Sequence, residues 1–151
     1  MKISLVSIGS KRGKNKRAQE DLLVDEYVRR AGRFASAEGL WVDTETAFWV
    51  FVDNAHGRSP TPTILMDAGG RALTSVEFAE TIAAFQDRGT QQIVVAIGGS
   101  DGWTADARRR ADLLVSMGRF TFPHSLARVV IAEQIYRAMT ILAGHPYHCG
   151  H

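Results

Sequence analysis

Three residues in the last third of the chain could move a proton during catalysis. His124 lies near the start of the segment 121–148, and Tyr147 and His148 lie at its end. Imidazole and phenol groups are common general acids and bases. His124 also opens a predicted helix, whose dipole disfavours a charged ring and leaves the imidazole able to accept a proton. A hydrogen-bonding role at the start of that helix is an equal alternative.

The same tail offers nitrogen and sulfur donors for a metal ion. His145, His148, Cys149 and His151 lie close together, and imidazole and thiolate are zinc ligands. Donors so close in sequence rarely complete a tetrahedron without partners from elsewhere, and their spacing matches no standard zinc pattern. We therefore expect no metal here.

A long helix is expected to position these groups. Pro123 fits a first helical turn, Gly144 fits a stop and Pro146 prevents continuation, so a helix is predicted over residues 123–143. One of its faces mixes aliphatic side chains with an acid and a base, a pattern that suits a protein partner. That face consists of Leu126, Val129, Val130, Glu133 and Arg137.

Alternation of strands and helices predicts an α/β fold with a parallel sheet covered on both faces. Strands are expected at residues 3–9, 40–42, 63–66, 93–97 and 113–117. Helices are expected at residues 20–34, 48–55, 74–89 and 104–111, before the C-terminal helix.

Ligands of such sheets bind beyond the carboxyl ends of the strands. The loops after Met66, Ile97 and Met117 occupy that position. The second loop, residues 98–102, is rich in glycine, so its backbone can approach a ligand closely. It is neither a dinucleotide fingerprint nor a P-loop, and ordinary turn chemistry is an open alternative.

Size and composition predict one compact domain in the cytoplasm. The 151 residues are 45% hydrophobic, enough for a core without disulfides. The longest apolar runs are far shorter than the roughly 20 residues of a membrane span. The N-terminus does not resemble a signal peptide, and the single cysteine, Cys149, cannot form an internal disulfide.

Basic residues concentrate near the N-terminus, although the net charge is only +2. Lys11, Arg12 and Lys14 belong to an opening segment without acidic residues. Such a patch can neutralise RNA phosphates, and a solvated loop is an equal alternative.

Two sequence segments resemble the ribosomal RNA large subunit methyltransferase H family of the SPOUT superfamily. They are AIGGSDGW at residues 96–103 and FTFPHSLARVVIAEQIYRAMTILAGHPYH at residues 120–148. The likeness extends to ILMDAGGRALTSVEFA at residues 64–79, whereas residues 38–62 do not match closely. It implies a single SPOUT domain over residues 1–151, with a mostly parallel five- to six-stranded sheet and a C-terminal trefoil knot, an exception to the usual absence of knots.

The resemblance implies methyl transfer from S-adenosyl-L-methionine to N3 of a pseudouridine in 23S ribosomal RNA on the assembled ribosome. It further implies a homodimer formed through the C-terminal helix, and no membrane partner. The alternative is a knotted ribosome- or RNA-binding protein without transfer activity. Donor-binding positions carried over from the family are Met66, Gly98, Met117, Gly118, Arg119, Phe120, Thr121 and Phe122.

The implied chemistry gives roles to the polar residues of the C-terminal segment. N3 of pseudouridine is a weak nucleophile while it keeps its proton, so a base would help, and His124, Tyr147 and His148 are the candidates. Arg128 and Arg137 are expected to bind RNA phosphates or to pair with Glu133 across a dimer interface.

The end of the chain departs from the family pattern. Members usually follow the Tyr-His pair with arginine or lysine, whereas Cys149 stands here. One basic group expected to help bind RNA is therefore missing or replaced.

Overall fold

The computed structural model describes residues 1–9 and 19–149. Five strands of this part of the chain form one parallel sheet in the order β2-β1-β4-β3-β5. They are β1 (Lys2–Ile8), β2 (Ser36–Val42), β3 (Thr63–Ala72), β4 (Gln92–Ile97) and β5 (Leu113–Ser116). The helices are α1 (Gln19–Ala31), α2 (Glu45–Asn54), α3 (Ser75–Asp87), α4 (Ala105–Arg110) and α5 (His124–Leu142).

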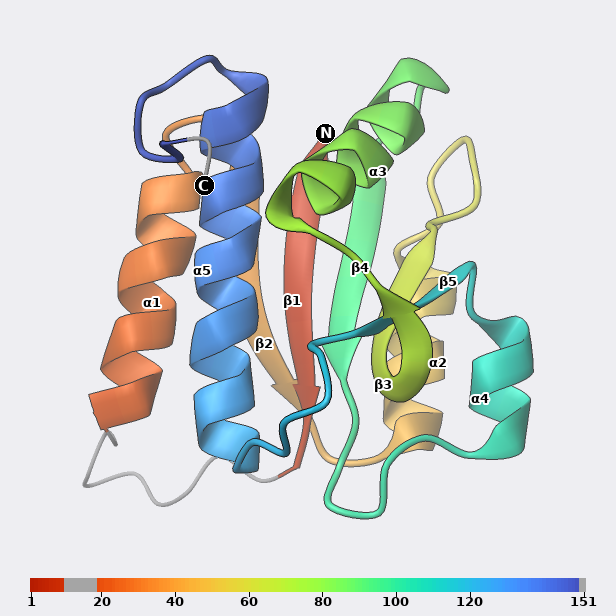
Figure 1. The fold of residues 1–151 in the computed structure, drawn as a ribbon. Coiled ribbons are helices and arrows are strands. Elements are labelled where there is room, and N and C mark those ends of the chain that lie inside the picture. Colours follow the sequence, from red (N-terminus) through yellow and green to blue (C-terminus); the bar gives the residue numbers. More distant parts are fainter. Residues whose placement is uncertain (10–18, 150–151) are drawn as a thin grey trace.

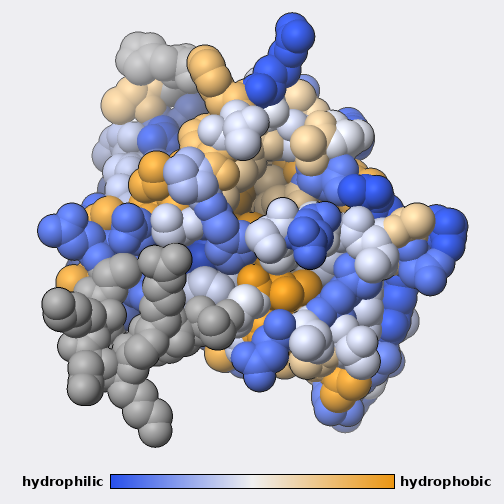
Figure 2. Space-filling view, turned by 90° about the horizontal axis from the view of Figure 1, so that it is seen from below, coloured by the Kyte–Doolittle hydropathy of each residue, from blue (hydrophilic) through white to orange (hydrophobic). Residues whose placement is uncertain are grey.

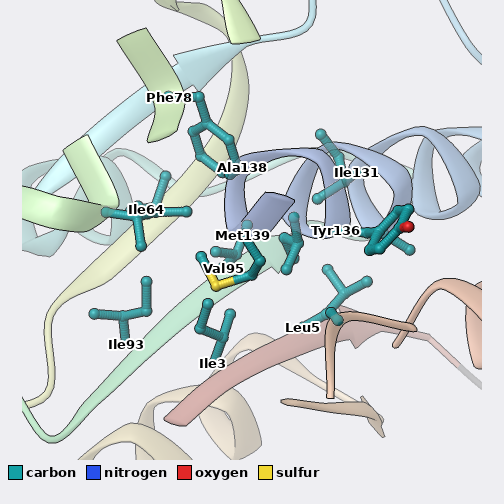
Figure 3. Close-up of a cluster of buried hydrophobic side chains, with 14 of the residues drawn as sticks. Ile3, Leu5, Ile64, Phe78, Ile93, Val95, Ile131, Tyr136, Ala138 and Met139 are labelled. Atoms are coloured by element: carbon teal, nitrogen blue, oxygen red, sulfur yellow. The ribbon is translucent and has the colours of Figure 1, made fainter. Parts of the chain in front are cut away.

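Helices cover both faces of the sheet (Figure 1), as predicted. Because strand side chains alternate between faces, Ile3 and Leu5 of β1 pack with α1, α3 and α5 (Figure 3), whereas Val6 and Ile8 pack with α2 and α4. Every predicted strand and helix is confirmed, and the trefoil knot stays a prediction. No helix among the described residues is long and apolar enough to cross a membrane.

Local signals explain where two of the helices begin and end. Thr74 and Glu77 form a reciprocal capping box at the start of α3, with hydrogen bonds of 3.1 and 2.7 Å. Helix α5 starts after Pro123 and ends before Gly144, whose φ of +68° favours glycine. The predicted boundaries of both helices are correct to within about two residues.

The partner face predicted on α5 is not its core face. The apolar residues of the core face are Ala127, Ile131, Ala132, Ile135, Tyr136, Ala138 and Met139. Leu126 is 45% exposed, and Val129 and Val130 are half-buried. The predicted partner face is therefore still available to a partner.

Strand β3 contains a β-bulge near its carboxyl end, close to the three expected binding loops. Met66 and Arg71 both pair with Val115 of β5, so the residues between them bulge out of the ladder. Gly70 lies in the bulge, where its backbone approaches β5 closely. A Cβ at this position would lie only 2.5 Å from the carbonyl carbon of Leu114.

Replacing Gly70 with alanine is expected to lower the free energy of unfolding by about 1–3 kcal/mol, because the added methyl group has no space against a backbone. The matched control is Gly69→Ala, whose Cβ would meet only the Asp67 side chain, at 3.2 Å. Urea denaturation of both variants measures the difference. Equal losses would contradict the close approach at Gly70.

Candidate methyl-donor site

The three loops expected to bind a ligand meet around one cavity of about 850 Å³ at the carboxyl edge of the sheet. Figure 2 looks onto this edge and shows apolar surface among polar side chains. Seven of the eight predicted donor-binding residues line the cavity: Met66, Gly98, Met117, Gly118, Phe120, Thr121 and Phe122. Arg119 is exposed and is not among the lining residues.

Trp103 links the glycine-rich loop to the end of β3 by a hydrogen bond. Its indole is 4% exposed, and its Nε1–H donates to the Met66 carbonyl at 3.0 Å. A Cβ at Gly98 would lie 3.2 Å from this ring, so only glycine fits without a shift. Two of the three binding loops are thereby held together.

The third loop turns sharply at Gly118, whose φ is +99°. The Ser116 hydroxyl accepts a 3.1 Å hydrogen bond from the Gly118 N–H. Phe120 follows with 87% of its surface exposed, whereas Phe122 is half-buried. Both rings line the cavity, and that of Phe120 is also largely open to solvent.

An ion pair closes the rim of the cavity beside the bulge. Arg108 Nε donates to Asp67 Oδ2 at 2.8 Å, and the Gly69 N–H donates to Oδ1 at 2.8 Å. Burial acts to raise the pKa of Asp67, but these two hydrogen bonds outweigh it and lower the pKa. Asp67 is therefore held as a carboxylate.

His124 lies at the edge of the donor cavity, as the sequence predicts. Its Nε2 is 2.8 Å from the Gly98 carbonyl oxygen. Because a carbonyl only accepts, Nε2 carries a proton, and Nδ1 is the nitrogen left to act as a base. The ring also lies 5.9 Å from that of Trp41, centroid to centroid.

Arg128 has a structural role within the chain, and its contact with RNA stays a prediction. The residue is only 4% exposed. Its Nε donates to Ser7 Oγ at 2.8 Å, its Nη1 donates to Asp21 Oδ1 at 2.6 Å, and its guanidinium lies 4.0 Å from the Trp41 ring centroid. Its Nε and Nη1 donors are therefore used within the chain.

The C-terminal candidates form a separate cluster. Arg137 Nη2 donates to Glu133 Oε1 at 2.6 Å, so this pair lies within one helix rather than across an interface. Arg137 Nη1 also donates to Nδ1 of His148 at 3.1 Å, and Tyr147 donates to Glu133 at 3.0 Å. His124 and Arg137 are about 20 Å apart along α5, so one chain does not bring all three catalytic candidates together (Figure 1).

Tyr147 is not a base near neutral pH. Burial, together with the hydrogen bond to Glu133, raises the pKa of Tyr147 to about 12. The phenol therefore keeps its proton and can act only as a donor. His148 uses Nδ1 to accept from Arg137, so its neutral ring carries its proton on Nε2.

The remaining predicted contacts fall in the N-terminal basic segment and the tail. Lys11, Arg12 and Lys14 lie outside the described residues. Among the residues that are described, no group of three or more His, Cys, Asp or Glu side chains could hold a metal ion. His151, one of the four possible donors, also lies outside that part.

A family model described as predicted SPOUT methyltransferase matches residues 1–148. The chain belongs to the SPOUT methyltransferase family. A relative from Koribacter versatilis (strain Ellin345), named ribosomal RNA large subunit methyltransferase H, is 42% identical over 151 residues and covers 100% of both chains. Another of that name, from Methylobacterium nodulans, is 37% identical over 167 residues and covers 99% of each chain.

Two solved structures share the fold. A probable methylase family protein from Haemophilus influenzae Rd KW20 has a TM-score of 0.55 at 11% identity, over 97% of this chain and 70% of that one. The SpoU methyltransferase AviRb from Streptomyces viridochromogenes, in complex with the cofactor AdoMet, has a TM-score of 0.51 at 12% identity, over 95% and 58%.

The cofactor of this SPOUT methyltransferase is S-adenosyl-L-methionine, and the cavity at the three loops fits it. The volume lies in the range of small-molecule sites. Met66, Met117 and Phe122 offer apolar contact for an adenine ring. Gly102 and Gly118 leave open space where a side chain would project, so a ligand can approach their backbone.

Sequence reasoning missed the residues that support this site. Trp41 and Asp21 act through Arg128, and Arg108 acts through Asp67. Each pair joins elements that are distant in sequence, so no local spacing of residues indicates the contact. Trp103 stood in a motif that resembles the family, and its hydrogen bond to Met66 was not foreseeable from that motif.

Arg128→Met is expected to lower the free energy of unfolding by about 3 kcal/mol or more, because Asp21 loses its partner in a largely buried position. The control is Arg109→Met, whose side chain is 71% exposed and pairs with Asp106; its cost should stay below about 1 kcal/mol. Urea denaturation tests both variants. Unchanged stability together with lost RNA binding would instead support the phosphate role of Arg128.

Proposed function

We propose that this protein transfers a methyl group from S-adenosyl-L-methionine to N3 of a pseudouridine in 23S ribosomal RNA on the assembled ribosome. The observation that carries the proposal is the single cavity lined by seven of the eight expected donor-binding residues. The names of the full-length relatives support ribosomal RNA of the large subunit as the substrate. The match over residues 1–148 supports one SPOUT domain.

His124 is the best placed of the three candidates to take the N3 proton. The sulfonium of the cofactor supplies an activated methyl group, so the protein must align the acceptor and remove one proton. His124 lines the donor cavity and has its Nδ1 directed away from the bond to Gly98. Tyr147 is protonated near pH 7, and His148 already accepts from Arg137.

We infer that the C-terminal cluster serves the cavity of a second copy of the chain. Tyr147, Arg137 and His148 lie at the end of α5 remote from their own chain's donor cavity. The neighbouring helices α1 and α5 carry exposed apolar side chains that a partner would cover. These are Leu22, Leu23, Leu126 and Leu142.

Mass spectrometry of large-subunit RNA tests the reaction. Wild-type protein should add one methyl group to a pseudouridine in ribosomes from cells that lack the gene. His124→Gln keeps a donor for the Gly98 carbonyl but has no base, so its kcat should fall about 100-fold or more while its Kd for the cofactor is unchanged. Cofactor and ribosome binding without any methylation would instead identify a binding protein.

Mixed dimers test whether the C-terminal cluster acts on the partner. A subunit with His124→Gln and a subunit with His148→Ala are each expected to be inactive as homodimers. Mixed in equal amounts, they should recover about a quarter of the wild-type activity, because half of the dimers then hold one complete site. No recovery, with mixed dimers demonstrated by mass, would show that the cluster acts within its own chain.

A further inference from the structure

A second cavity, of about 930 Å³, adjoins the donor cavity. Four residues line both: Gly99, Ser100, Gly102 and His124. The imidazole proposed to accept the proton therefore belongs to the wall between them. A group that enters the second cavity would reach both the glycine-rich loop and His124.

The wall of the second cavity is held by buried interactions. Arg128 is 4% exposed and is fixed by Ser7 and Asp21. Trp41 covers this guanidinium and lies beside His124, which sets an aromatic surface at the carboxyl ends of β1 and β2. Nucleic-acid-binding proteins commonly use such surfaces to receive an unstacked base.

The charge of the lining indicates which part of a nucleotide can enter. Among the described residues, Glu20, Asp21, Asp43, Glu45 and Asp101 line the cavity, against one arginine. An acidic excess repels phosphate but accepts N–H groups. The cavity therefore suits a base rather than the sugar–phosphate backbone.

Of these five acids, Asp21 and Glu45 are used within the protein, Glu20 is half-buried, and Asp43 and Asp101 are exposed. Asp21 pairs with Arg128, and Glu45 accepts from the backbone N–H and the hydroxyl of Thr104 at 3.0 and 2.6 Å. Asp43 and Asp101 are exposed, and neither forms an ion pair with another described residue. Their carboxylates are the acceptors that a bound base could meet.

We propose that the second cavity receives the target base, and that Asp43 and Asp101 select pseudouridine over uridine. The inference rests on the proposed function. Pseudouridine is attached to ribose through carbon and has N–H groups at both N1 and N3, whereas N1 of uridine is bonded to the sugar. With N3–H lost to His124, the N1–H remains as a donor that only pseudouridine offers to a carboxylate.

The test compares large subunits that carry pseudouridine or uridine at the target position, obtained from cells with and without the isomerising enzyme. Wild-type protein should prefer pseudouridine in kcat/KM. Asp43→Asn or Asp101→Asn should lower this preference about tenfold, because an amide can donate as well as accept. The Kd for S-adenosyl-L-methionine should stay the same. The matched control is Asp87→Asn, an exposed acid at the end of α3 that lines neither cavity.

The outcomes separate the inference from the proposed function. If wild-type protein methylates pseudouridine and neither asparagine variant changes the preference, only the assignment of the second cavity fails. If wild-type protein methylates neither kind of subunit, the proposed function itself fails. A loss of preference in Asp87→Asn as well would point to overall charge and would also overturn the inference.

Discussion

The buried guanidinium of Arg128 is the interaction on which the arrangement of the site depends. It joins β1 through Ser7, α1 through Asp21 and β2 through Trp41, while its own residue belongs to α5. A charge removed from water is tolerated only when its donors are satisfied. Four elements are therefore fixed relative to one another at the edge where both cavities open. His124 comes one turn earlier on α5, so its position follows from the same anchor.

The site divides its chemical tasks among regions of different polarity. The donor cavity combines apolar side chains with glycine backbone, which suits a cofactor that needs orientation more than proton transfer. The adjoining cavity is acidic, and the cluster at the far end of α5 holds a guanidinium, an imidazole and a phenol around one carboxylate. No single chain brings the third region to the first two, which makes a partner chemically useful.

Local patterns predicted the fold well because each signal was confined to a few neighbouring residues. The Thr74–Glu77 capping box and the Pro123 and Gly144 boundaries are examples. The three binding loops followed from the rule for parallel sheets, and the family resemblance supplied their ligand. The burial of Arg128 could not be predicted, because an arginine on a helix looks alike in sequence whether it is exposed or buried, and its partner Asp21 lies 107 positions away. Trp41 was overlooked for the same reason, in the stretch that matches the family least.

The bulge of β3 allows the shape of the donor cavity to change without a change in the pairing of the strands. Because Met66 and Arg71 meet the same residue of β5, the backbone leaves the ladder and returns to it at one point. Residues 67–69 between those points line the donor cavity. Insertions or deletions within this excursion would remodel the cavity wall while the strand register stays in place. The bulge is thus a position at which related sequences could vary how they hold the cofactor without refolding the sheet.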